Sequence, residues 1–166
     1  MNNIQLTSMT KELARSYFRE FTNDPDVFAD MTLFRDYAYS EQKADEYVEH
    51  QKGLGRVHLA ITKDDKVIGE IILKKIDRKN QCCTLSIHLK NDSVKNMGYG
   101  TEAEMLALRY AFHKLQMETV YADAIIKNTR SQHVLKKVGF TKMGMDDTFC
   151  YFRCDKATWK SASDLL

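Results

Sequence analysis

Lys95-Asn96-Met97-Gly98-Tyr99-Gly100-Thr101 is the stretch of this chain that decides its fold. It is a short polar segment with two glycines in G-x-G spacing, and it leads directly into a helical pattern. Glycines let a ligand approach the backbone closely, and the unpaired N–H groups of a first helical turn favour an anion. The stretch therefore predicts a phosphate-binding loop, although G-x-G before a helix also occurs as an ordinary strand-to-helix connection.

The flanking segments extend this loop into a strand-loop-helix-strand unit. Residues 84–89 alternate between apolar and polar side chains, which is typical of a half-buried strand. Residues 102–115 predict an amphipathic helix, and residues 119–126 predict a further strand. The apolar stripe of the predicted helix consists of Ala103, Leu106, Ala107, Tyr110 and Ala111.

A second motif follows this unit at residues 128–140. Asn128 can cap a short helix, and Gly139 can end that helix in a left-handed conformation. Phe140 would then begin another strand. The motif thus predicts a short capped helix directly after the strand of residues 119–126.

Together, the two motifs resemble those of the GCN5-related N-acetyltransferase (GNAT) superfamily. Its central Gln/Arg-x-x-Gly-x-Gly/Ala motif is similar to Lys95-x-x-Gly98-x-Gly100, and its later Asn-x-x-Ser…Gly-Phe pattern is similar to residues 128–140. In detail the chain resembles the branch of ribosomal-protein N-terminal and spermidine acetyltransferases. The resemblance covers about residues 84–144, while the N-terminal half agrees with it only in pattern.

The N-terminal half predicts two helices and a hairpin. One helix begins at Thr10 and ends near Pro25, the other begins at Ser40 and ends near Gly53, and strands at 56–61 and 66–73 follow. The resulting order is β-α-α-β-β-β-α-β-α-β-β. The resemblance implies an α/β (α+β) GNAT fold, with a mixed, mostly antiparallel sheet splayed at the cofactor strand and helices on both faces.

Length and composition predict one domain over residues 1–166, because 43% hydrophobic content can supply a sizeable core. The resemblance implies that this is an N-acetyltransferase domain. A net charge of +2 argues against a nucleic-acid partner. No segment resembles a secretory signal or a membrane helix, so we expect a soluble, cytoplasmic protein without a membrane partner. Histidine and cysteine spacings predict no metal site. Whether the protein forms a homodimer is left open by the sequence.

The resemblance implies acetyl-CoA as cosubstrate and a primary amine as acceptor, either a small molecule or a peptide or protein N-terminus, with direct transfer in a ternary complex. Backbone amides of residues 96–101 would neutralise the pyrophosphate, and main-chain groups of residues 88–90 would pair with the peptide-like pantetheine arm. The expected cofactor-binding residues are His88, Leu89, Lys90, Lys95, Asn96, Met97, Gly98, Tyr99, Gly100, Thr101, Asn128 and Ser131.

Acetyl transfer also needs a base, because an aliphatic amine with a pKa of about 10 is protonated at neutral pH. The candidates are Glu70, Ser86, His88 and Asp123 on predicted strands. Histidine side chains titrate near physiological pH, which favours His88, although a histidine on a strand is often purely structural. We predict His88 or Glu70 as the catalytic residue.

Position 135 departs from the family pattern, in which a tyrosine protonates the CoA thiolate. Leu135 stands there, so water, Ser131 or Tyr99 would have to supply the proton, or the thiolate leaves without one. The same departure suits an alternative function, a non-catalytic acetyl-CoA sensor or regulatory module. A nucleotide-binding protein is disfavoured because no G-K-[ST] follows the loop.

The resemblance implies that residues 24–39 and 146–151 form much of the acceptor side. These segments combine acidic with aromatic side chains, a combination that suits a cationic amine. Scattered acids at helix ends beside core aromatics explain the same pattern equally well, so the identity of the amine stays open.

Overall fold

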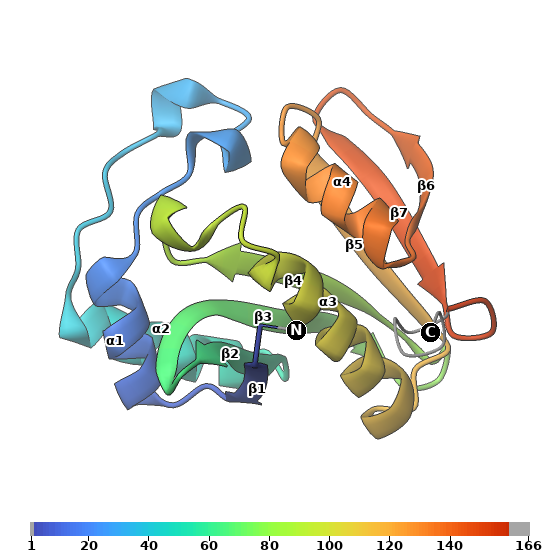
Figure 1. Ribbon diagram of the computed structural model, residues 1–166, viewed down its shortest axis with the longest axis horizontal. Helices are drawn as coiled ribbons and strands as arrows, with labels where there is room; N and C mark the ends of the chain where they lie inside the picture. Colours follow the sequence, from blue (N-terminus) through green and yellow to red (C-terminus); the bar gives the residue numbers. More distant parts are fainter. Residues whose placement is uncertain (1, 160–166) are drawn as a thin grey trace.

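The structure, a computed structural model, describes residues 2–159 and contains one seven-stranded sheet with helices on both faces (Figure 1). The order of strands and helices is the predicted one. The elements are β1 (Ile4–Ser8), α1 (Lys11–Glu20), α2 (Glu41–Gly53), β2 (Val57–Lys63), β3 (Lys66–Asp77), β4 (Cys82–Leu89), α3 (Tyr99–Arg109), β5 (Thr119–Ile125), α4 (Thr129–Val138), β6 (Thr141–Met145) and β7 (Phe149–Asp155), with 3₁₀ turns at Pro25–Val27, Met31–Leu33 and Asp92–Val94.

The sheet has the order β1-β2-β3-β4-β5-β7-β6, and its neighbours are antiparallel except for β4 and β5. The parallel pair is short. Cys82–Thr84 pair with residues 119–121, whereas both strands continue beyond these pairs without pairing to each other. β4 and β5 therefore diverge toward their carboxyl ends, which confirms the predicted splay of the sheet.

The helices cover opposite faces of the sheet. Leu59 and Ile61 of β2 pack in the same hydrophobic cluster as α3, whereas Ala60 between them packs with α1 and α2. Successive residues of a strand point to opposite faces. Helices α1 and α2 thus cover one face, and α3 covers the other together with α4, which packs beside it.

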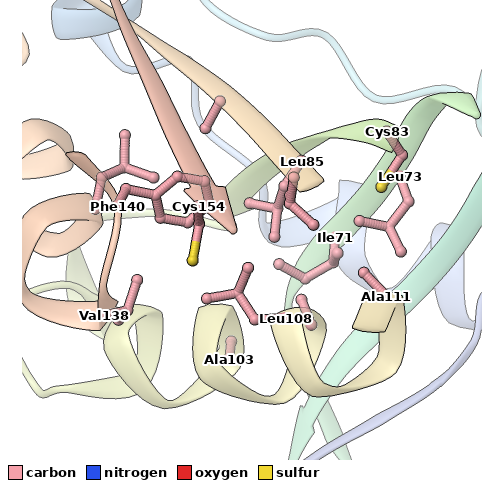
Figure 2. Packing of buried hydrophobic residues seen from close by; sticks show 14 of the residues in the cluster. Ile71, Leu73, Cys83, Leu85, Ala103, Leu108, Ala111, Val138, Phe140 and Cys154 are labelled. Atoms are coloured by element: carbon pink, nitrogen blue, oxygen red, sulfur yellow. The ribbon is translucent and has the colours of Figure 1, made fainter. Parts of the chain in front are cut away.

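The core between α3 and the sheet is the larger of the two clusters. Figure 2 shows Leu108 of α3, and Ala111 in the helical turn that follows it, facing Ile71 and Leu85 of the central strands. Burial of such apolar side chains contributes about 1.5–3 kcal/mol each for the larger ones. This packing fixes the position of α3 and of the loop that precedes it.

The helix predicted over residues 102–115 differs in two respects. It begins at Tyr99 and ends as an α-helix at Arg109, after which Tyr110–Lys114 form a π-helical turn. The predicted apolar stripe was also too narrow, because Glu104 and Leu108 are buried as well. The physical reason is that α3 contacts α4 as well as the sheet, so more of its circumference is covered.

Local signals placed the starts of the two N-terminal helices correctly, whereas α1 ends at Glu20, before the predicted end near Pro25, and β3 continues past the predicted residue 73 to Asp77. The Thr10 hydroxyl accepts a hydrogen bond from the Leu13 N–H, and the Ser40 hydroxyl accepts one from the Lys43 N–H, as expected of helix N-caps. Within residues 2–159, helices long and apolar enough to span a bilayer are absent.

Candidate active site

The loop before α3 has the backbone geometry of an anion site. Gly98 is the N-cap of α3 with φ +80°, and Asn96 also has a positive φ of 59°. Both lie in the left-handed region, which glycine and asparagine tolerate best. Since no described side chain caps this helix, the N–H groups of its first turn are available to an anion.

A cavity of about 370 Å³ lies beside this loop. Its walls come from the carboxyl end of β4, the loop before α3 and its first turns, one side of α4 and the connection between α1 and α2. Lys90, Met97 and Tyr99 are the expected cofactor residues that do not line it. The expected residues that do are His88, Leu89, Lys95, Asn96, Gly98, Gly100, Thr101, Asn128 and Ser131.

A second cavity, of about 210 Å³, lies at the gap between the diverging β4 and β5. It is lined by Ser86 and by Asp123, Lys74 and Phe149 from neighbouring strands. The two cavities meet at this gap, so a ligand in one can approach a ligand in the other. Their common lining residues are Val27, Ile87, His88, Glu104, Asn128 and Ser131.

The main chain of β4 has a free edge at this gap. The Lys90 N–H donates to the Ile68 carbonyl across the β3–β4 ladder, 2.9 Å away. Successive residues of a strand direct their N–H and C=O groups to alternate sides. The N–H and C=O groups of His88 therefore also point toward β3. The N–H and C=O groups of Ile87 and Leu89 point toward β5, which no longer pairs with β4 at these residues.

Glu70 is the centre of a buried hydrogen-bonded cluster on the face covered by α1 and α2. Its carboxylate lies 2.7 Å from His58 Nε2 and accepts a hydrogen bond from the Tyr47 hydroxyl at 3.0 Å. His88 is directly opposite Glu70 in the β3–β4 register, with Nδ1 3.5 Å from the same carboxylate. Three elements thus hold one carboxylate in place.

Glu70 and His88 differ in charge environment and in accessibility. Burial acts to raise the pKa of Glu70, but hydrogen bonds from His58 and His88 outweigh it and hold that pKa at about 2. Glu70 is therefore an ionised anchor. The His88 side chain is 44% exposed and lines both cavities, whereas Glu70, with its side chain 5% exposed, lines neither.

Asp24, in the connection between α1 and α2, lines the larger cavity and pairs there with two cations. Its Oδ2 lies 2.6 Å from Lys95 Nζ and 3.1 Å from Arg130 Nη2. Burial opposes ionisation of Asp24, but the hydrogen bond from Lys95 and further contacts lower its pKa overall. Lys95 is consequently engaged by carboxylates, with Asp92 as a second partner at 2.8 Å.

Glu104 of α3 is a buried carboxyl group that the sequence analysis missed. It is 1% exposed, it lines both cavities, and its Oε2 has no hydrogen-bond partner among the described residues. Burial raises its pKa to about 8. The group therefore carries a proton at neutral pH, unlike Glu70.

Comparison with known proteins identifies the family. The family model described as the acetyltransferase (GNAT) domain matches residues 3–141. The chain belongs to the GNAT acetyltransferase family. It is 30% identical over 127 residues to the probable N-acetyltransferase YjcK of Bacillus subtilis, covering 72% of this chain and 70% of that protein. The uncharacterized N-acetyltransferase YnaD of Bacillus subtilis is 27% identical over 128 residues, covering 75% and 72%.

The fold of this GNAT protein also agrees with solved structures. A spermidine N-acetyltransferase from Vibrio cholerae, in complex with CoA and spermine, superimposes with a TM-score of 0.75 at 16% identity, covering 95% of this chain and 98% of that one. Membership in the family makes the chain an acetyl-CoA-dependent acyltransferase. Its uncapped α3 terminus and the free edge of β4 fit a pyrophosphate and a peptide-like arm, respectively.

The predicted acceptor segments of this GNAT protein are largely occupied by local turns. The Asp30 carboxylate accepts from the Thr32 N–H, and Asp146 accepts from the N–H groups of Thr148 and Phe149. Phe28 and Phe34 pack edge to face at 5.3 Å. These contacts favour the structural interpretation of that acidic and aromatic pattern. No group of three or more potential metal ligands occurs within residues 2–159.

Proposed function

We propose that this protein acetylates a primary amine, either a small molecule or a peptide N-terminus, by direct transfer from acetyl-CoA in a ternary complex. We further propose that residues 1–166 form one N-acetyltransferase domain. The observation that carries the proposal is the meeting of the two cavities at the gap between β4 and β5. Two substrates bound there at once would need no covalent intermediate on the protein.

The cofactor assignment uses main-chain groups. Amides of residues 96–101 at the α3 terminus hold the pyrophosphate. Ile87 and Leu89 pair with the pantetheine arm across the free edge of β4, and one of their N–H groups polarises the thioester carbonyl. Asn128 and Ser131 form the opposite wall at the start of α4.

We assign the role of general base to His88 and a positioning role to Glu70. His88 lines both cavities, and a hydrogen bond from its Nδ1 to the Glu70 carboxylate leaves Nε2 as the basic nitrogen of the ring. The ring accepts a proton from the attacking amine, either directly or through water. Glu70 cannot take this proton near neutral pH, because its own pKa is about 2.

The acceptor enters through the smaller cavity, where Asp123 offers a carboxylate and Phe149 an apolar surface. This pairing suits an aliphatic amine with a cationic group. The fold-level likeness to a spermidine N-acetyltransferase makes polyamines reasonable first probes beside short peptides.

The experiment is a turnover screen with acetyl-CoA against spermidine, spermine, amino sugars and short peptides with free N-termini. Released CoA and the acetylated product are both quantified. We expect stoichiometric product with at least one class of amine. A protein that binds acetyl-CoA but acetylates none of them at any pH between 6 and 9 would contradict the proposal.

A further inference from the structure

Glu104 lies where the two cavities meet. It belongs to α3, which packs against β3 and β4 of the sheet. Both cavities are also lined by Ile87 and His88 of β4 and by Asn128 and Ser131 at the start of α4. An acidic side chain on the buried side of a helix costs free energy unless it is paired. At 1% exposure and without a partner for Oε2 among the described residues, Glu104 is not explained by packing.

None of the described charged side chains near Glu104 forms an ion pair with its carboxyl group. Burial is the cause of its raised pKa, about 8, and no described side chain forms a hydrogen bond or ion pair with it. The carboxyl therefore retains its proton at neutral pH. The titratable and charged side chains that line the same cavities are His88 of β4, Lys74 of β3, Asp123 of β5, Arg130, His133 and Lys137 of α4, and Asp24 and Lys95 of the loops.

We propose that Glu104 is the general acid of this acetyltransferase and protonates the CoA sulfur as the acetyl group leaves. The inference rests on the proposed function. It also accounts for Leu135, which lines the smaller cavity as an apolar residue and has no proton to give. Glu104 lines the same cavity from α3, which packs beside α4.

The proton balance of the step is complete. The amine nitrogen forms a bond to the acetyl carbon, and the carbon–sulfur bond breaks with its electron pair on sulfur. The Glu104 carboxyl gives its proton to that sulfur, so that CoA leaves as a thiol. The acceptor reacts as the neutral amine, after its ammonium form has lost a proton to solvent. The proton that its nitrogen loses in the transfer goes to His88, which releases it to solvent, and solvent restores the proton on Glu104. A carboxyl and a thiol with a pKa near 8.5 exchange a proton with little driving force in either direction.

The first test needs no substrate. Infrared spectra of the unliganded protein across pH 5 to 10 should contain the carbonyl band of a protonated carboxyl that persists at pH 7 and is lost as the pH rises through about 8. Glu104→Gln should remove this band. Glu102→Gln is the matched control, because that carboxylate binds the N–H groups of Asn2 and Ile4 outside the cavities. Absence of the band at pH 7 in the wild type would overturn the proposal.

The second test varies the leaving group. Hydroxylamine serves as acceptor because it is small and largely unprotonated at pH 7. Acetyl-CoA is compared with its analogue carrying selenium in place of sulfur, since a selenolate leaves without protonation. Glu104→Gln should lower the rate with acetyl-CoA by about 10²–10⁴-fold and the rate with the selenoester by about twofold. Glu104→Leu, which fills the site with an apolar side chain, should show the same rate losses as Glu104→Gln. The melting temperatures of both variants check that they are folded.

The outcomes separate the two proposals. Equal losses with both donors would assign Glu104 a structural role, and an undiminished rate in a folded variant would assign it none; either overturns the inference and leaves the proposed function intact. A wild-type protein that binds acetyl-CoA but acetylates neither hydroxylamine nor the amine panel would overturn both.

Discussion

The carboxylate of Asp24 lies 2.6 Å from Nζ of Lys95, at the mouth of the cavity assigned to acetyl-CoA. A bound phosphate would compete with this carboxylate for the same cation. Asp24→Asn should therefore tighten acetyl-CoA binding by about fivefold, or about 1 kcal/mol, as measured by calorimetry. Asp30→Asn, which alters a local turn, is the control. Weaker binding in Asp24→Asn would show that the ion pair organises the site instead.

Glu70 makes stability dependent on pH in the acid range. Its pKa is about 2 in the folded protein and 4.5 in a model peptide, so the stabilisation is complete above pH 4.5 and is lost as the pH falls toward 2. Glu70→Gln should lower the free energy of unfolding at pH 7 by about 1–3 kcal/mol and flatten its acid dependence. Denaturant unfolding at several pH values measures both, with the exposed Glu49→Gln as control. An unchanged acid limb in Glu70→Gln would refute the assignment.

His88→Gln tests the base. Turnover should fall by about 10²–10⁴-fold, because no other described side chain is assigned to take the proton from the amine. His113→Gln, in the π-helical turn and outside the lining of both cavities, should leave turnover unchanged. Full activity of His88→Gln between pH 6 and 9 would transfer the role to water or to the substrate itself.

Leu135→Tyr tests whether the missing tyrosine limits the rate. Leu135 is 2% exposed in the main core, so the larger side chain should cost about 1–3 kcal/mol in stability. If Glu104 already supplies the proton, turnover should rise by no more than about twofold. Steady-state rates and thermal melts on one preparation decide this. A large gain in turnover in a stable protein would mean that protonation of the thiolate was rate-limiting.

The order of elements was predictable because its signals are local. Caps at Thr10, Ser40 and Asn128 depend on residues within three positions along the chain, and all three are confirmed. Gly139 ends α4 with φ +117°, also as predicted. The splay of the sheet was predicted only from the resemblance to the GNAT family, because the alternation of apolar and polar residues in a strand does not indicate where its pairing with a neighbouring strand ends.

The contents of the site were less predictable because they depend on long-range geometry. Tyr47, His58 and Glu70 meet only once the register of β2 and β3 and the position of α2 are set. Asp24 and Lys95 are 71 positions apart. Glu104 was missed for another reason: an acidic residue in an apolar helical pattern is normally assigned to the solvent face, and only the packing of α3 on two sides reveals its burial.

The most direct test is a calorimetric titration of acetyl-CoA into the wild type and Gly100→Val. Gly100 lines the cavity without a positive φ, and a Cβ there would meet Leu89 Cδ1 at an ordinary 3.9 Å, so the fold should tolerate the change. Gly98→Val is less clean, because φ +80° adds strain. Gly53→Val, with no atom within 4 Å of its Cβ, is the control.

We predict that the wild type and Gly53→Val bind acetyl-CoA alike, and that Gly100→Val raises the dissociation constant by at least an order of magnitude, about 1.4 kcal/mol. Equal affinity for acetyl-CoA in a folded Gly100→Val protein would contradict the placement of the cofactor beside α3.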